Sequence, residues 1–261
     1  MTVTIDSFTV EQLEFYLLIV VRISTLVATA PILNIRNVPR KVKVGLAVFL
    51  SVIEIALMEY VPLSYTGVLG YAVLVTKEAL TGALIGLASG FCIYIIDFSG
   101  HLIDMEIGFS MVTLFDPATQ TQTSISGVFL NQLIMLVMLV SNLHLYIIRT
   151  IYDSFEVIPL GGAVVTGNLY LVYMEYMVNY FIIGFRVVLP VFASILIINI
   201  VLGVLAKVAP QMNMFSIGMQ LKVTTGLVVL TVLVTMLPGI GDFLFAQMSD
   251  LTSAMVKALT P

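Results

Sequence analysis

Charged residues are scarce in this sequence. Asp, Glu, Lys and Arg make up 10% of its 261 residues, whereas a soluble globular domain has about 25%. The net charge is −4 and the few Lys and Arg residues are scattered, with no basic tract. The composition therefore predicts no nucleic-acid partner.

Residues that commonly carry out chemistry are equally few. Cys92 is the only cysteine, which excludes an internal disulfide; because it lies in an apolar run, it is predicted to be a small buried hydrophobe. The two histidines, His101 and His144, form no His-Glu-x-x-His motif, and no Walker loop is present, so a zinc hydrolase and a phosphate-binding loop have no support. The sequence predicts no catalytic residue, no metal and no cofactor.

Hydrophobic residues are what the chain has in excess. They make up 60% of the sequence, and the mean hydropathy is +1.11. A soluble fold of this size could not hide so much apolar surface. We therefore expect an all-α, multi-helix integral membrane protein, organised as a single domain over residues 1–261.

Six apolar blocks are visible along the chain, and each is a candidate membrane crossing. The third and fifth exceed the roughly 20 residues that a crossing needs, so they must tilt, kink or continue outside the bilayer. Pro190 offers a kink in the fifth block. The blocks are at about residues 15–33, 44–61, 68–96, 128–148, 169–206 and 223–245.

The positions of Lys and Arg predict the orientation of these crossings. Arg36, Arg40, Lys41 and Lys43 lie in the first connection, and Lys207 and Lys222 flank the last one. Basic loops stay in the cytoplasm. Six crossings then place both termini outside.

Among the charged residues inside the apolar blocks, five stand out, because a charge costs about 2.5–3.5 kcal/mol at a bilayer centre. One interpretation is that they reach toward the membrane surface, which fits Lys77 and Arg186. Alternatively, they pair inside a helical assembly or line a wet cavity, and a proton or ion relay is a third possibility. The five are Arg22, Glu54, Lys77, Glu78 and Arg186.

Gly82, Gly86 and Gly90 share one helix face, because they are spaced by four residues. Such a stripe lets another helix backbone approach closely. The stripe predicts close helix packing, either within this chain or with a partner subunit.

The long connection at residues 97–127 mixes bulky apolar residues with carboxylates. Phe109 and Phe115 lie in it beside Asp104, Glu106 and Asp116. An aqueous loop would not carry such residues, so we expect this segment to pack against protein or to close a passage. Its methionines suit a seal that must deform.

A four-residue pattern, Gly239-Ile240-Gly241-Asp242, matches the Gly-x-Gly-Asp of intramembrane aspartyl proteases, with Asp97 as the possible second carboxylate. So short a pattern is a weak signal. The preferred interpretation is a turn or helix break after Pro238.

Several longer motifs, taken in order, resemble the FliR family, the flagellar members of the FliR/SpaR/YscT group of type III export-apparatus proteins. The resemblance covers nearly the whole chain. One departure is Glu106, where many relatives are expected to have Gln. The motifs are Lys77-Glu78-Ala79-Leu80-Thr81-Gly82, Gly86-Leu87-Ala88-Ser89-Gly90-Phe91, Gly100 to Ser110, Leu114-Phe115-Asp116-Pro117, Phe129-Leu130-Asn131, Ser154 to Pro159, Pro190-Val191 and Ala209-Pro210-Gln211-Met212-Asn213.

The resemblance implies a fold of bent helical hairpins within a helical export gate in the bacterial inner membrane, at the flagellar basal body. FliP and FliQ homologues would be partners in the gate, with FlhB and FlhA homologues beside it and unfolded flagellar proteins as the cargo. The five charges named above would then lie at subunit contacts. A loop that seals the pore is implied at Phe109, Ser110, Met111, Leu114, Phe115, Asp116, Pro117, Gln120 and Gln122.

Two other classes of function remain open from the sequence. A secondary transporter or small ion channel would use the charges as a substrate or proton path, although no internal symmetry of the kind common in transporters is evident. An intramembrane protease would need both Asp97 and Asp242.

Overall fold

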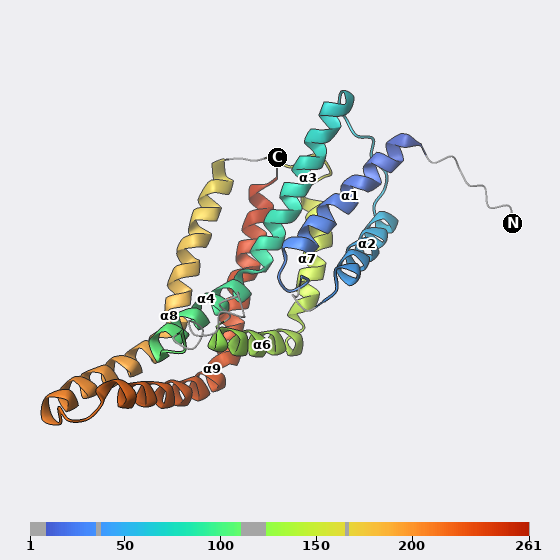
Figure 1. Cartoon of the computed structure of the whole chain (residues 1–261). Coiled ribbons are helices and arrows are strands. Elements are labelled where there is room, and N and C mark those ends of the chain that lie inside the picture. The colour runs from blue at the N-terminus through green and yellow to red at the C-terminus, as the bar shows by residue number, and fades with distance from the viewer. Residues whose placement is uncertain (1–8, 35–37, 111–123, 165–166, 261) are drawn as a thin grey trace. The chain divides into compact units, whose positions relative to one another are not determined.

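The computed structural model describes residues 9–34, 38–110, 124–164 and 167–260, and within these ranges it is all helical, as predicted (Figure 1). α1 (Val10–Thr29) begins with a capping box, in which Thr9 and Gln12 satisfy each other's backbone N–H groups. α2 (Arg40–Leu57) and α3 (Gly67–Ser89) follow, and both contact α1.

The rest of the chain forms shorter helices and then two long ones. α4 (Phe91–Ile107), α6 (Ile125–Val140) and α7 (Leu143–Val157) precede α8 (Gly167–Val208) and α9 (Met214–Ala258). Pro190 and Pro238 lie inside α8 and α9, and neither ends its helix. The predicted helix break after Pro238 is therefore wrong.

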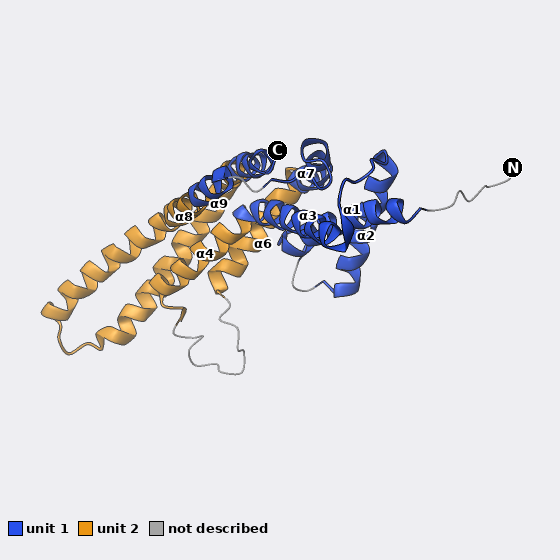
Figure 2. Cartoon of the chain, turned by 90° about the horizontal axis from the view of Figure 1, so that it is seen from above, with its two compact units in different colours: residues 1–91, 143–175, 246–261 blue, residues 92–142, 176–245 orange. Residues whose placement is uncertain are grey.

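The chain divides into two compact units (Figure 2). Unit 1 contains residues 1–91, 143–175 and 246–261, and unit 2 contains residues 92–142 and 176–245. α8 and α9 each contribute to both units. The prediction of one domain over residues 1–261 stays a prediction.

Unit 1 has a core built around α1. The apolar side chains of α1 recur at helical spacing and are buried against α3, α7 and the end of α9. This core includes Phe15, Ile19, Ile23, Leu26, Ile85, Ile151, Phe155, Ile158, Val256 and Leu259.

Unit 2 is held by close contacts between helix backbones and small side chains. Cys92 is 1% exposed and its thiol donates to the carbonyl of Leu244 at 3.1 Å, which confirms that it is a buried structural residue. Burial raises the pKa of this thiol. Ser99 donates to the carbonyl of Gly184 at 3.0 Å and joins α4 to α8 in the same way.

The count of six crossings is too high for the described residues. Four helices there are long and apolar enough to cross a membrane, namely α1, α3, α8 and α9, and a fifth span results if α6 and α7 count as one. α2 carries Arg40, Lys41, Lys43 and Glu54 within 18 residues and does not meet the same standard. Hydropathy gave too many crossings because it counted the apolar residues of the second block alone. The helix that contains this block, α2, also includes the charged residues at its N-terminal end.

Two of the apolar blocks are also interrupted. The fourth breaks at Ser141 and Asn142, where Asn142 has a φ of 56°, and α6 and α7 meet there at 73°. The third block is divided at Gly90, between α3 and α4. An apolar run shows where water is excluded, but it does not show where a helix bends.

Candidate functional site

A buried ion pair lies at the centre of unit 1. Nε of Arg22, on α1, is 2.5 Å from Oε2 of Glu78, on α3, and both side chains are essentially unexposed. Nη1 of Arg22 also donates to the carbonyls of Ser154 and Ile158, at 3.1 and 2.9 Å. Arg22 thus binds two carbonyls at and just beyond the C-terminal end of α7, and the Ser154 carbonyl also accepts from N–H of Ile158 at 3.0 Å.

Glu78 also binds the turn that follows α7. Its other oxygen accepts a hydrogen bond from the backbone N–H of Gly161 at 2.7 Å. Gly161 has a φ of +75°, a conformation that favours glycine. Lys77 donates to the Gly161 carbonyl at 3.5 Å. The turn after α7 is therefore held by two consecutive residues of α3.

The ring of Phe155 completes the surroundings of Arg22. The guanidinium carbon lies 4.4 Å from the ring centroid, which is a cation–π contact. Nη2 of Arg22 has no hydrogen-bond partner among the described residues. The pair is therefore shielded from solvent on every side and has one donor unused.

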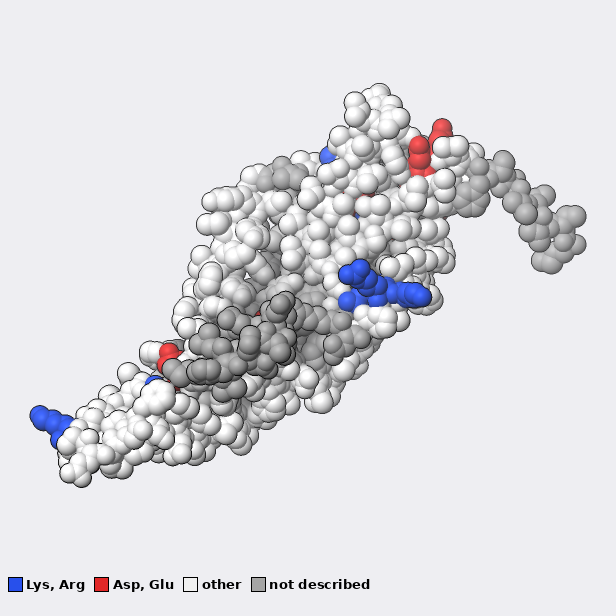
Figure 3. Space-filling view, viewed as in Figure 1, with Lys and Arg blue, Asp and Glu red and all other residues white. Residues whose placement is uncertain are grey.

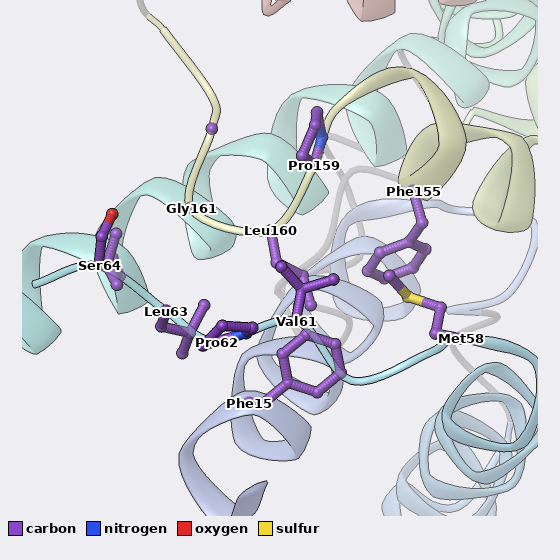
Figure 4. A pocket seen from close by; sticks show the side chains of 12 residues that line it. Phe15, Met58, Val61, Pro62, Leu63, Ser64, Phe155, Pro159, Leu160 and Gly161 are labelled. Atoms are coloured by element: carbon purple, nitrogen blue, oxygen red, sulfur yellow. The ribbon is translucent and has the colours of Figure 1, made fainter. Parts of the chain in front are cut away.

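A cavity lies beside this turn, as Figure 4 shows. Its volume is about 320 Å³, and its walls come from α1, the segment before α3 and the turn after α7. Phe15, Met58, Val61, Phe155 and Leu160 line it. The turn that Glu78 holds is thus also one wall of an apolar cavity.

Glu54, on α2, is the third buried charge of unit 1 and is 4% exposed. Burial raises its pKa above the ordinary value of 4.5; Arg22 opposes this rise and Glu156 adds to it. The folded state therefore binds the Glu54 proton more tightly than the unfolded chain does.

This raised pKa predicts how stability depends on pH. Stability from Glu54 is fully present below pH 4.5 and is lost as the pH rises through the raised pKa. We expect Glu54→Gln to stabilise the protein at neutral pH. The melting temperature of this variant is expected to change less with pH between pH 4.5 and neutrality than that of the wild type. Glu59→Gln, at an exposed position just beyond the end of α2, is the control. Parallel pH curves for wild type and Glu54→Gln would contradict this.

The glycine stripe lies against α1 of the same chain. A Cβ at Gly82 would be 2.1 Å from the carbonyl oxygen of Arg22, and one at Gly86 would be 2.0 Å from Oγ1 of Thr29. Gly90 is buried and ends α3. Two of the three glycines therefore pack α1 against α3, and this crossing brings Arg22 to Glu78.

Arg186 has a different environment from Arg22 and Glu78. It is exposed on α8 and forms no ion pair within the described ranges. It lines an apolar groove of about 690 Å³ in unit 2, together with Pro190, Met236 and Phe243. The five predicted charges are thus not one cluster: Arg22, Glu54, Lys77 and Glu78 belong to unit 1, and Arg186 belongs to unit 2. Their place at subunit contacts stays a prediction.

Only the beginning of the predicted sealing loop is described. Phe109 and Ser110 follow Gly108, whose φ of +97° ends α4, and both are half-buried. Met111, Leu114, Phe115, Asp116, Pro117, Gln120 and Gln122 lie outside the described residues.

The structure adds one residue to which sequence reasoning gave no role. Asp104 is buried on α4 and accepts hydrogen bonds from the first residues of α6. The available signal was Ser124, because a Ser before an apolar run is typical of a helix N-cap. Nothing in the sequence pairs that serine with a particular carboxylate.

Two further hypotheses from the sequence concern a protease pair and a metal site. Asp97 and Asp242 are both exposed, and Gly239 to Asp242 continue α9 as helix. The described part of the chain has no group of three His, Cys, Asp or Glu side chains that could hold a metal ion.

The outer surface of both units is largely apolar. Figure 3 shows a face with few charged side chains, and basic ones gather over the start of α2. On α8 and α9, Phe185 is 54% exposed, Ile197 61% and Val228 60%. Many exposed apolar side chains of this kind need lipid or protein to cover them. Fold and surface together define a multi-pass, all-helical membrane protein.

Comparison with known proteins defines the family. The model of the family "Bacterial export proteins, family 1" matches residues 13–248. The flagellar biosynthetic protein FliR of Pectobacterium carotovorum subsp. carotovorum is 31% identical over 242 residues, 92% of each chain. FliR of Bacillus subtilis is 33% identical over 220 residues, 83% of this chain and 85% of the relative. The secretion system apparatus protein SsaT of Salmonella typhimurium is 29% identical over 165 residues, 62% of each. The chain belongs to the FliR family of bacterial export proteins, components of type III export apparatus in the inner membrane.

Proposed function

We propose that this protein is a non-enzymatic subunit of the flagellar type III export gate in the basal body. With FliP and FliQ homologues it forms the channel through which unfolded flagellar proteins are exported, next to FlhB and FlhA homologues. The observation that carries the proposal is the exposed apolar surface of α8 and α9, in a chain whose buried Arg22 and Glu78 pair with each other. Such helices need partner helices or lipid to cover them.

Gene deletion with complementation tests this assignment. We expect the deletion strain to lose export of hook and filament subunits and to stop swimming, and the full chain to restore both. Purification of the chain in mild detergent is expected to recover FliP and FliQ homologues. A deletion strain that still exports and swims rules the assignment out.

We further propose that residues 109–122 seal the channel in its resting state. Bulky apolar side chains close a pore because they exclude water from it. Phe109→Ala, Met111→Ala and Phe115→Ala are therefore expected to raise ion conductance severalfold when the assembled complex is placed in planar bilayers. Conductance at the wild-type level in all three variants would contradict a seal at these positions.

The second candidate function is a secondary transporter or small ion channel. The Arg186 groove favours it, because an arginine that forms no ion pair among the described residues and lies in an apolar wall can attract an anion. Purified chain without partners distinguishes the two: solute flux by the chain alone supports transport, whereas a gate subunit alone is expected to be inactive.

A further inference from the structure

An apolar groove with one cation in its wall lies between α8 and α9 in unit 2. α8 contributes Arg186 and Pro190, and α9 contributes Thr235, Met236 and Phe243. The volume of the groove is about 690 Å³, which is within the range of sites for small molecules, about 300–1,000 Å³. The groove is therefore large enough to hold a ligand.

The charge of Arg186 has no internal partner. The side chain is exposed on α8 and forms no ion pair among the described residues. No other charged residue lines the groove. The N–H groups of a guanidinium match the oxygens of a phosphate, often two at a time. The groove thus combines one phosphate-binding group with an otherwise uncharged wall.

The charges of α8 and α9 lie around two uncharged stretches of similar length. Residues 187–206 of α8 and 223–241 of α9 contain no Asp, Glu, Lys or Arg. A helix of about 20 residues spans about 30 Å, the thickness of the hydrocarbon core of a bilayer. Arg186 directly precedes the first stretch, and the groove extends from it into both stretches, along Pro190 and Met236. A bilayer around these stretches places Arg186 at the level of the lipid phosphates and most of the groove at the level of the acyl chains.

We propose that the groove binds one anionic phospholipid, with its phosphate on Arg186 and an acyl chain against Pro190 and Met236. A free anion would leave the apolar wall exposed, whereas an acyl chain covers it. A partner helix would have to carry a carboxylate into an apolar segment, which is costly, whereas a phospholipid has its phosphate at the membrane surface. The inference needs only a membrane protein and does not depend on the proposed gate.

Native mass spectrometry of the purified full-length chain, titrated with dioleoyl phosphatidylglycerol in mild detergent, measures the binding. We expect one tightly bound lipid per chain in the wild type. Arg186→Ala is expected to weaken the binding about tenfold, because a charge-assisted hydrogen bond to the phosphate is lost. Arg186→Lys keeps the charge and is expected to weaken it less. Asp242→Asn, at an exposed position of α9 that does not line the groove, is the control and is expected not to weaken it.

Gly239→Leu tests the apolar part of the groove while Arg186 stays in place. Gly239 lines the groove, and no atom lies within 4 Å of a Cβ built on it, so a larger side chain fits there and fills the groove. We expect this variant to bind the lipid as weakly as Arg186→Ala does. Gly203→Leu is the matched control, because Gly203 lies on α8 outside the groove and its Cβ would also meet no atom.

Three results of the titration would overturn the proposal. Wild-type binding in Gly239→Leu would mean that the arginine holds an anion without the groove. Equal affinity for dioleoyl phosphatidylcholine would mean that the net charge of the lipid is not recognised. Displacement of the lipid by an equimolar amount of inorganic phosphate would mean that the site takes a free anion.

A photoreactive benzophenone side chain at Gly239 identifies the occupant in the native membrane, where every partner is present. After illumination, we expect mass spectrometry to detect a covalent lipid adduct on the chain. A crosslink to a partner protein without a lipid adduct would assign the groove to a partner helix and overturn the proposal.

Discussion

Replacing Arg22 by alanine is expected to cost about 3–5 kcal/mol of folding free energy, because it leaves the Glu78 carboxylate buried without its charge partner. The carbonyls of Ser154 and Ile158 lose their donor at the same time. Burial leaves no water to replace the missing group, since Glu78 is unexposed. The N–H of Gly161 remains the main partner of the carboxylate.

Equilibrium unfolding of the purified chain in mixed micelles, followed by circular dichroism, measures this cost. Arg149→Ala is the matched control, because that arginine is also in unit 1 and pairs with Asp153 at 3.5 Å, with 80% of its side chain exposed. An exposed pair of this kind contributes little. Equal losses of folding free energy in the two variants would mean that burial does not increase the contribution of the Arg22–Glu78 pair to stability.

A double variant separates the charge from the packing. Arg22→Met combined with Glu78→Leu replaces both charges by apolar groups, which removes the unpaired ion. We expect it to recover most of the stability lost in Arg22→Ala. The carbonyls of Ser154 and Ile158 still lack the hydrogen bonds that Arg22 donates, so the recovery is expected to be incomplete.

Replacing Gly82 by alanine is expected to have the second largest effect, about 3 kcal/mol of destabilisation. The added Cβ would be 2.1 Å from the backbone oxygen of Arg22 and 2.3 Å from Oγ1 of Thr25. A backbone oxygen cannot rotate away, so α3 must move off α1, and overpacking of this kind costs about 1–3 kcal/mol or more. The same movement would pull Glu78 away from Arg22.

Gly45→Ala, on α2, provides the control for this prediction. No atom lies within 4 Å of a Cβ at Gly45. Alanine in a helix is favoured over glycine by about 1 kcal/mol, so Gly45→Ala is expected to be neutral or stabilising. Thermal melting of the two variants in detergent measures the difference, and a Gly82→Ala protein as stable as Gly45→Ala would contradict the close crossing.

Patterns that are local in the sequence predicted much of the architecture. Apolar runs predicted an all-helical membrane protein, and the spacing of Gly82 and Gly86 predicted a close helix crossing. The apolar runs did not predict the bend at Asn142, because a bend depends on the backbone conformation of one residue. They also predicted a crossing at α2, where the charged residues of the helix argue against one.

The ordered motifs were enough to indicate the FliR family, because they extend over nearly the whole chain. The loop residues 109–122 received their role from that family alone. Their seal stays a prediction, since only Phe109 and Ser110 fall within the described ranges.

The sequence by itself determined that Arg22, Glu54 and Glu78 need partners, because a charge in an apolar segment is costly wherever it lies. Only the tertiary structure decided which partners they have. Arg22 meets Glu78 across 56 residues and the carbonyl of Ser154 across 132 residues. Hydropathy sums over neighbours in the chain, whereas an ion pair depends on the distance between segments that folding brings together.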